Sequence, residues 1–345
     1  MNLQKLKIGL LVSTIGLLSL SPTPIKGEET ITIEEEPLTL LETAELWRRP
    51  RLIQSFIGHE GAVNALTFSP DGDIVVSGGS SNDPTLKFWS IATGKEIEKI
   101  RAQRTAVMEI AISPNGATLV STGEDSGINI WDWQTGEFLF TFFEHGSNIL
   151  SMVISPDSSV MVTGGLDGIR VWNLTPKRPI FILDGIGNPT YALAMHPNGY
   201  IVASGHQDGV VRFWNLRTTQ ELSEFILHDN LVSGLAFTPD GSKLITSSYD
   251  GTIKVWDLVT QQLLFTMTGH RSIIRAIALN PDGIILASAG NDGVRLWNIE
   301  TGEFLGVASG HTDWVQSLAF SNDGRRLATG GFDRIIRIWE IPEAF

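Results

Sequence analysis

Short runs of alternating polar and apolar residues follow one another from residue 51 to the end of the chain. Val63–Phe68 is one such run, Val232–Phe237 and Val315–Phe320 match it, and Thr252–Trp256 alternates strictly. Alternation with a period of two is typical of strands that bury one face. Turn sequences rich in Pro, Asn, Asp and Gly separate the runs and leave no stretch long enough for a helix. The pattern therefore predicts many short antiparallel strands.

The strand pattern repeats with a period of about 42 residues. Seven tryptophans mark the period, at Trp89, Trp131, Trp172, Trp214, Trp256, Trp297 and Trp339. Turn signals recur in phase with them, at 69–72, 113–116, 155–158, 196–199, 238–241, 280–283 and 321–324. Each period has room for four strands and three turns, which is the size of one propeller blade.

The two ends of the repeat region complement each other. The last repeat stops at Trp339–Ile341, after its third strand, whereas Leu52–Ile57 looks like a fourth strand without a repeat of its own. Pairing this first strand with the last blade would remove two unpaired sheet edges, which otherwise promote aggregation. We therefore expect an all-β, seven-bladed β-propeller over residues 51–345, with four antiparallel strands per blade, closed by the N-terminal strand.

Two dipeptides within the repeats are shared with a known family. Gly-His and Trp-Asp occur at Gly58-His59, Gly269-His270, Gly310-His311, Trp131-Asp132 and Trp256-Asp257. With these motifs, the chain from about residue 51 onward resembles the WD-repeat β-propellers. The motifs are specific for the fold and say little about function. The resemblance implies a scaffold that binds protein partners through the loops at one end of the ring.

Three further residue types recur at nearly constant distances from the tryptophans. An aspartate lies five or six residues before each one, at Asp83, Asp125, Asp167, Asp208, Asp250, Asp292 and Asp333. A Ser or Thr stands four residues before the aspartate, or six in the first repeat, which has a two-residue insertion. These residues are Ser77, Ser121, Thr163, Ser204, Thr246, Ser288 and Thr329. Histidines stand further upstream, at His59, His145, His228, His270 and His311.

These residue types can form one hydrogen-bonded chain in each blade. Trp only donates, ionised Asp only accepts, and Ser, Thr and His do both. The set matches the structural tetrad of the WD-repeat family. A catalytic triad is rejected because a hydrolase needs one such site, and this chain repeats the set at a fixed offset. Gln103 and Ile186 replace the histidine in the second and fourth repeats, where we expect incomplete tetrads, and His196 and His206 are assigned to turns.

Composition excludes several classes of function. Asp and Glu outnumber Lys and Arg by 38 to 25, which argues against a nucleic-acid partner. The absence of cysteine excludes disulfides, thiolate nucleophiles and Cys-ligated zinc. No phosphate-binding loop, dinucleotide fingerprint or His-Glu-x-x-His motif occurs. We therefore expect no catalytic residue, metal site or cofactor, and a monomer that binds protein partners.

The family resemblance also implies where a partner binds. In WD-repeat propellers the residues that flank the start of each inner strand, and the residue before the tetrad Asp, face the top surface. Carried onto this sequence, they form a partner-binding face that contains Met108, Leu150, Leu166, Tyr191, Tyr249, Arg275, Trp314 and Phe332. Trp, Tyr and Arg are frequent interface anchors. The alternative is that several of these side chains pack against neighbouring blades.

One inner-strand position breaks the pattern of its equivalents. The third residue of this strand is small in six repeats, but it is Glu109 in the second. The carboxylate is expected either to face a solvated channel or to pair with Arg101 or Arg104. The alternative is a contact with a ligand or cation, which keeps open an enzyme or ligand binder that uses the central channel.

Residues 1–27 have the pattern of a secretory signal peptide. Lys5 and Lys7 precede thirteen uncharged residues, Ile8–Leu20, which would span only about 20 Å as a helix. The segment 28–50 carries seven Glu and is expected to be an acidic linker, of which Leu40–Trp47 could form a short helix. The protein is expected to be secreted or periplasmic, like a secreted bacterial WD-repeat protein, with no membrane span after cleavage. Retention of residues 1–27 would make it a membrane-tethered envelope assembly factor.

Overall fold

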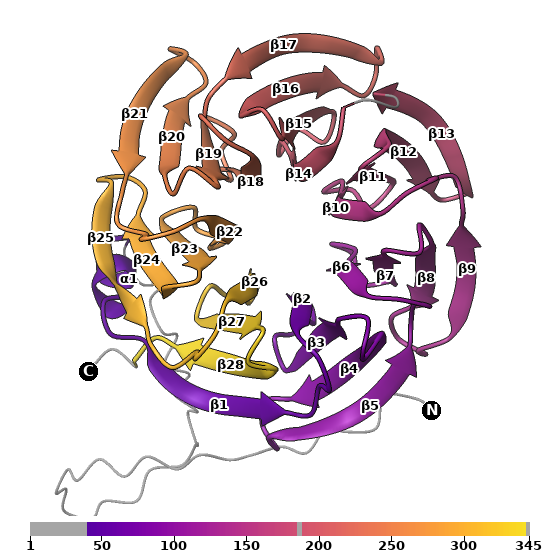
Figure 1. Cartoon of the computed structure of the whole chain (residues 1–345), viewed down its shortest axis with the longest axis horizontal. Helices are drawn as coiled ribbons and strands as arrows, with labels where there is room; N and C mark the ends of the chain where they lie inside the picture. Colours follow the sequence, from indigo (N-terminus) through magenta and orange to yellow (C-terminus); the bar gives the residue numbers. More distant parts are fainter. Residues whose placement is uncertain (1–39, 185–187, 343–345) are drawn as a thin grey trace, which may run out of the picture.

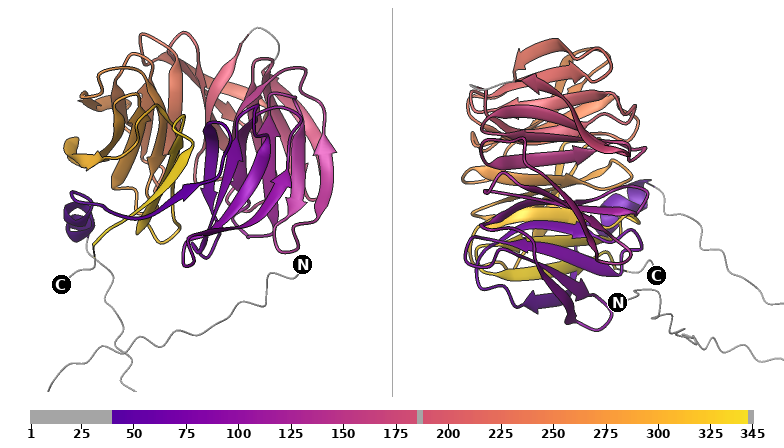
Figure 2. Two further views of the ribbon diagram at one scale, coloured as in Figure 1. Left: turned by 60° about the horizontal axis from the view of Figure 1, so that its bottom comes forward. Right: turned by 90° about the vertical axis from the view of Figure 1, so that its right-hand side faces the viewer.

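Each repeat folds into one four-stranded antiparallel sheet, and seven sheets stand around a ring (Figure 1). The computed structural model describes residues 40–184 and 188–342. The described residues contain 28 strands and one short helix. The strands stand side by side around a central opening (Figure 1), and the right-hand, edge-on view shows a flattened disc (Figure 2). The seven-bladed propeller expected from the repeats is confirmed.

The strands follow the chain from the centre of each blade outward, so that the first strand of a blade is innermost. Blades one to three comprise β2 (Val63–Phe68), β3 (Ile74–Gly79), β4 (Thr85–Ser90), β5 (Lys95–Arg101); β6 (Val107–Ile112), β7 (Thr118–Gly123), β8 (Ile128–Asp132), β9 (Phe138–Phe142); and β10 (Ile149–Ile154), β11 (Val160–Gly165), β12 (Gly168–Leu174), β13 (Lys177–Asp184). Blades four and five comprise β14 (Thr190–Met195), β15 (Ile201–His206), β16 (Val210–Asn215), β17 (Gln220–Ile226); and β18 (Val232–Phe237), β19 (Lys243–Ser248), β20 (Ile253–Asp257), β21 (Gln262–Met267). Blades six and seven comprise β22 (Ile274–Leu279), β23 (Ile285–Gly290), β24 (Gly293–Asn298), β25 (Glu303–Ala308); and β26 (Val315–Phe320), β27 (Arg326–Gly331), β28 (Ile335–Glu340), β1 (Arg51–Ile57).

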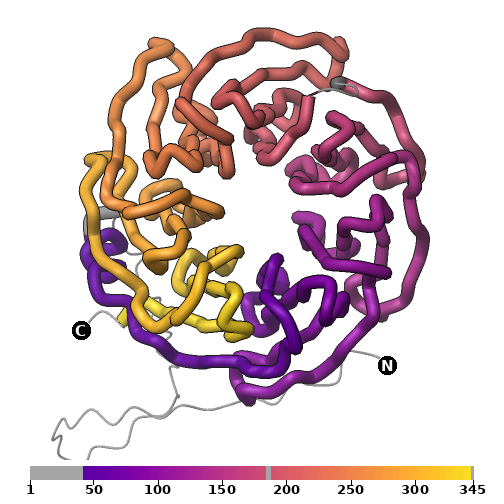
Figure 3. Tube along the Cα trace, viewed as in Figure 1, coloured from indigo at the N-terminus to yellow at the C-terminus, as the bar shows by residue number. Residues whose placement is uncertain are grey.

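The N-terminal strand closes the ring, as expected. β1 pairs antiparallel with β28, with Leu52 opposite Trp339 and Ile57 opposite Ile335. The Cα trace shows the first and last parts of the chain meeting in this one blade (Figure 3). Phe56 of β1 is buried and stacks on Trp89 of blade one, with the ring centroids 5.1 Å apart. The closing strand therefore joins the last blade to the first.

Apolar clusters fill the space between neighbouring blades. The cluster between blades seven and one includes Phe56, Val63, Trp89 and Ile338. Close approach requires small residues in the second strand of a blade. A Cβ added at Gly330 would lie 2.7 Å from a methyl carbon of Val63, well inside van der Waals contact. These dry contacts around the ring hold the blades together.

The end of the expected acidic linker belongs to the folded domain. Helix α1 (Leu40–Leu46) leads to Trp47, which is fully buried and meets Phe320 edge-on at 5.3 Å. Arg48 Nη2 lies 2.9 Å from Glu303 Oε1 on β25. The signal peptide 1–27 and linker residues 28–39 lie outside the described residues. Within the described ranges, no helix has the length and apolar character needed to cross a membrane.

Candidate functional site

Four blades contain the complete hydrogen-bonded tetrad. In blade one, His59 Nδ1 lies 2.7 Å from Asp83 Oδ2, and His59 Nε2 lies 2.7 Å from Ser77 Oγ. Trp89 Nε1 donates to the same Ser77 oxygen at 2.8 Å. Blades three, six and seven repeat this arrangement with His145, Thr163, Asp167 and Trp172; His270, Ser288, Asp292 and Trp297; and His311, Thr329, Asp333 and Trp339.

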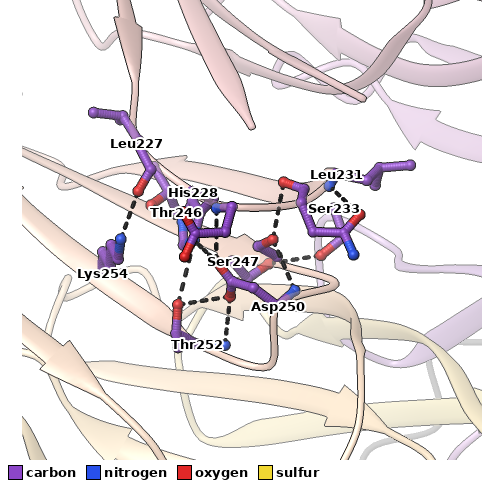
Figure 4. A network of polar contacts seen from close by, with 12 residues as sticks. Leu227, His228, Leu231, Ser233, Thr246, Ser247, Asp250, Thr252 and Lys254 are labelled. Carbon is purple, nitrogen blue, oxygen red and sulfur yellow. Dashed lines mark hydrogen bonds and ion pairs between the residues drawn. The ribbon is translucent and has the colours of Figure 1, made fainter. Parts of the chain in front are cut away.

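The tetrad of blade five lacks its tryptophan. His228 lies 2.8 Å from Asp250 and 2.7 Å from Thr246, and Thr252 also donates to Asp250 (Figure 4). The Trp256 indole nitrogen is buried without a hydrogen-bond partner among the described residues. The prediction that Trp256 donates to Thr246 is therefore wrong. Its ring instead packs against the apolar cluster between blades four and five.

Blade two has no histidine link to its aspartate. Gln103 Nε2 donates to Ser121 Oγ at 3.4 Å, and Trp131 Nε1 reaches the same oxygen at 3.4 Å. Asp125 accepts the Arg104 backbone N–H at 2.7 Å, while its other carboxylate oxygen is buried without a partner in the described part of the chain. Both bonds to Ser121 are long, so the network is weaker than in the complete blades.

Blade four replaces its missing histidine from another position in the chain. The sequence assigned His206 to a turn, but this residue is the last one of strand β15. Its Nε2 lies 2.8 Å from Ser204 Oγ, and Trp214 Nε1 donates to that oxygen at 2.8 Å. His206 Nδ1 faces the Pro189 carbonyl oxygen at 3.1 Å. Asp208 is exposed and accepts the Val210 N–H as its one hydrogen bond from the described residues, and Ile186 lies outside them.

Electrostatics keep the tetrad histidines neutral. Burial lowers the pKa of His59 to about 4, because desolvation outweighs the attraction of Asp83. The pKa values of His145, His228, His270 and His311 are also lowered, with burial as the largest cause. A neutral ring donates from Nδ1 to the carboxylate and accepts the Ser or Thr hydroxyl at Nε2. The tetrads thus satisfy polar groups within the blades.

A second group of residues surrounds the central opening, and its members stand at β-bulges in the innermost strands. In β22, Ile274 pairs with Gly290 and Ala276 pairs with Ala289, which leaves Arg275 as the extra residue. A β-bulge breaks the alternation and redirects a side chain. The bulged residues of all seven blades line the central cavity: Asn64, Met108, Leu150, Tyr191, Ser233, Arg275 and Gln316.

The central cavity has a volume of about 750 Å³. The residues that follow the bulges form a second ring of lining positions: Ala65, Glu109, Ser151, Ala192, Gly234, Ala276 and Ser317. Tyr249 and Phe332 line it as well, from turns that follow β19 and β27. A cavity of this size with a mixed polar and apolar wall can hold a ligand or part of a polypeptide.

Arg275 is the centre of an aromatic cluster at this site. Its guanidinium carbon lies 4.7 Å from the Trp314 ring centroid and 6.0 Å from those of Tyr249 and Phe332. These contacts are cation–π interactions. Arg275 Nε is buried without a hydrogen-bond partner, and no carboxylate of the described residues forms an ion pair with this guanidinium. We call Tyr249, Arg275, Trp314 and Phe332 the Arg275 cluster.

Six of the eight residues of the expected partner-binding face line the cavity: Met108, Leu150, Tyr191, Tyr249, Arg275 and Phe332. Trp314 is not a lining residue, but its ring packs on Arg275 and its carbonyl oxygen accepts the Phe332 N–H at 2.8 Å. Leu166 is not a lining residue and is 39% exposed. Gly165 pairs with Gly168, so Leu166 sits at the tip of a two-residue turn. The spacing of five residues between Asp167 and Trp172, where most blades have six, is the sequence signal of this shorter turn.

Glu109 stands in the wall of the cavity, and the Ile110 backbone N–H is a hydrogen-bond donor to its carboxylate. Of the two expected environments, a pairing with Arg101 or Arg104 is not seen among the described residues, and the residue instead lines the central cavity. Its side chain is half-buried, because one side opens onto the cavity and protein atoms surround the rest. This desolvation raises the pKa of Glu109 to about 8. Among the described residues, no group of three His, Cys, Asp or Glu side chains could hold a metal ion.

Comparisons with known proteins place the repeats in a family. The family described as "WD domain, G-beta repeat" matches residues 50–90, 94–132, 136–173, 177–215, 219–257, 261–298 and 302–340. Similar proteins include autophagy-related protein 16 of Arabidopsis thaliana, which is 31% identical over 156 residues, or 44% of this chain and 30% of that protein. Nuclear distribution protein PAC1 of Arthroderma otae is 29% identical over 196 residues, or 48% of this chain and 42% of that protein.

A third relative is the small ribosomal subunit protein RACK1y of Oryza sativa subsp. japonica. It is 26% identical over 171 residues, or 46% of this chain and 49% of that protein. The similarity thus spans less than half the length of each of these relatives. The family match, by contrast, covers nearly the whole propeller in seven consecutive repeats. The chain belongs to the WD40 repeat family.

Proposed function

We propose that this protein is a non-catalytic scaffold that binds a protein partner at the rim of its central cavity, after export from the cytoplasm. The Arg275 cluster carries the binding part of this proposal. Its guanidinium has aromatic neighbours on several sides but no carboxylate within ion-pair distance in the described structure. A partner that brings an acceptor to Arg275 would satisfy this donor and cover the three aromatic rings.

The composition of the rim supports a protein partner. Interface hot spots are enriched in Trp, Tyr and Arg and lie in pockets from which a partner excludes water. Leu150, Tyr191 and Leu231 extend the apolar part of the lining beyond the Arg275 cluster. Related WD-repeat proteins with names such as nuclear distribution protein and small ribosomal subunit protein are consistent with a scaffold.

We expect Trp314→Ala to weaken partner capture about thirtyfold while leaving the propeller folded. Loss of a hot-spot aromatic typically costs at least about 2 kcal/mol of binding free energy. Trp314 is half-buried, and the Arg275 guanidinium lies over its ring. The measurement is capture from an extract of the native source, quantified for the parent and the variant at matched protein concentration, together with a thermal melt of each.

Two matched variants make the comparison specific. Phe140→Ala removes an aromatic side chain that is 42% exposed on the outer strand β9, and should leave capture unchanged. Trp89→Ala removes a tetrad donor and should lower the melting temperature. Trp314→Ala melting as low as Trp89→Ala would make Trp314 a core residue. Normal melting and normal capture would place the partner on another surface.

Export is the second part of the proposal, and it rests on the basic and apolar pattern of residues 1–27. We expect the mature protein to begin near Glu28 and to be found outside the cytoplasm. Mass spectrometry of the N-terminus, combined with fractionation of the cells, measures both. An intact Met1 on a soluble cytoplasmic protein would contradict export. Recovery of uncleaved protein in the membrane fraction would favour the membrane-tethered assembly factor instead.

A further inference from the structure

Glu109 is the exception in an otherwise small ring of cavity-lining residues. Blades one and three to seven place Ala, Ser or Gly at this position, and each of these residues lines the cavity. Six small side chains keep the cavity wide at this level. The glutamate alone has the length and the charge to bind a group that enters the channel.

The charge of the cavity wall depends on this one residue. The other charged lining residues are Glu60, Glu124, Arg275 and Arg334, whose formal charges sum to zero. The strands packed next to β6 contribute Asn64, Leu66, Leu150 and Met152 to the lining, and none of these is charged. Ionised Glu109 therefore gives the wall a net negative charge, located on the side of blade two.

The opposite wall carries the opposite sign. Arg275 lies on β22, which faces β6 across the opening (Figure 1). A cation entering the cavity is repelled by this guanidinium and attracted by Glu109. Apolar side chains line the cavity near Glu109. Met108 precedes it in β6, and Leu150 and Met152 lie on β10 of the next blade, so that an aliphatic stem would find apolar contacts there.

We propose that the cavity wall at Glu109 binds the cationic side chain, a lysine or an arginine, of the partner segment that covers the rim. This inference rests on the proposed function, because it assumes a polypeptide at the mouth of the cavity. To the proposed partner segment it adds one specific feature, a cationic side chain that enters the cavity. Long cationic side chains suit such a site, since their stems bury against apolar walls while the charged head reaches its partner.

Proton release provides a signature of this contact. In the free protein, desolvation keeps the Glu109 carboxyl largely protonated below its pKa of about 8. A cation pairs with the ionised form, so binding at neutral pH must expel a proton. The affinity for a cationic probe should therefore rise roughly a hundredfold between pH 6 and pH 9, while a lysine side chain stays charged over this range.

The test uses the full chain and a defined pair of probes. N-acetyl-lysine N-methylamide carries the cation, and N-acetyl-norleucine N-methylamide has a neutral stem of nearly the same length. Methionine labelled with ¹³C at the methyl group reports binding, because Met108 and Met152 line the cavity whereas Met161, Met195 and Met267 do not. Each probe is titrated at several pH values, and calorimetry in buffers of different ionisation enthalpy counts the released protons.

We expect saturable shifts of the Met108 and Met152 signals with the lysine probe, and affinity at least tenfold lower in Glu109→Gln. Glu109→Ser, which copies the residue of blades three and seven, should behave in the same way and serves if the glutamine variant does not fold. Equal binding of both probes, full affinity in both variants, or no saturable shift in the parent would each overturn the proposal. The titration needs no partner, so its failure is separate from a failure of partner capture.

Discussion

A chain that begins at Gly58, and therefore lacks β1, is expected to aggregate instead of forming a monomeric propeller. β1 is the fourth strand of blade seven, and its removal leaves the edge of β28 unpaired. It also removes the Phe56 ring that stacks on Trp89 across the junction with blade one. Exposed sheet edges promote association with other chains.

Two longer chains serve as controls for this deletion. A chain that begins at Leu40 keeps α1, Trp47 and β1, and should melt like the parent. A chain that begins at Arg51 keeps β1 but loses Trp47, and should be soluble and less stable by about 3–5 kcal/mol, the usual cost of emptying a buried tryptophan site. Light scattering and thermal melts measure both properties. A soluble monomer from the Gly58 chain that melts like the parent would contradict ring closure by β1.

The propeller could be predicted because its signals repeat. A single turn such as Ser69–Gly72 is weak evidence, but seven turns and seven tryptophans in phase at about 42 residues leave few other architectures. The closing strand followed from counting, since one end of the repeat region lacked a strand and the other had one in excess. These arguments use period and number, which sequence reports directly, and need no knowledge of side-chain geometry.

The candidate site was harder to predict because it depends on local backbone geometry. The bulge that makes Arg275 and Met108 line the cavity interrupts the alternation of an inner strand, and a period-two pattern does not reveal it. The replacement of a missing histidine by His206 joins residues two apart, a spacing no other blade uses. Trp256 has the position of a tetrad donor, yet its ring packs against the cluster between blades four and five and its N–H has no partner among the described residues.

The effect of removing a tetrad aspartate is expected to differ strongly between blades. Asp83→Ala in blade one removes the acceptor of His59 Nδ1 and the carboxylate 3.3 Å from Lys87 Nζ. The side chains of Asp83 and Lys87 are each only 3% exposed, so the lysine charge would remain buried, with only the more distant and more exposed Glu96 carboxylate, 3.9 Å away, as an ion-pair partner among the described residues. Breaking a buried ion pair in this way costs about 3–5 kcal/mol.

Asp208→Ala in blade four is the matched control. Asp208 occupies the same repeat position, but it is exposed, and in the described part of the chain it accepts only the Val210 N–H, at 3.3 Å. Its loss should cost less than about 1 kcal/mol, because His206 and Trp214 keep their bonds to Ser204. Urea unfolding at neutral pH measures both variants. Equal losses would mean that the His59–Asp83 and Lys87–Asp83 contacts do not stabilise blade one as the distances suggest.

The deficit of Asp83→Ala should also depend on pH in a defined direction. Burial acts to raise the pKa of Asp83, but hydrogen bonds from Thr85 and the Glu60 N–H, together with His59, lower it to about 2. An aspartate with a lowered pKa stabilises the fold above its unfolded value of about 3.8, and this contribution is lost as the pH falls toward 2. The parent and Asp83→Ala should therefore converge below pH 4 and differ by a constant amount above it. A difference in unfolding free energy that stays the same from pH 7 to pH 2.5 would show that the ionised carboxylate is not what stabilises the tetrad.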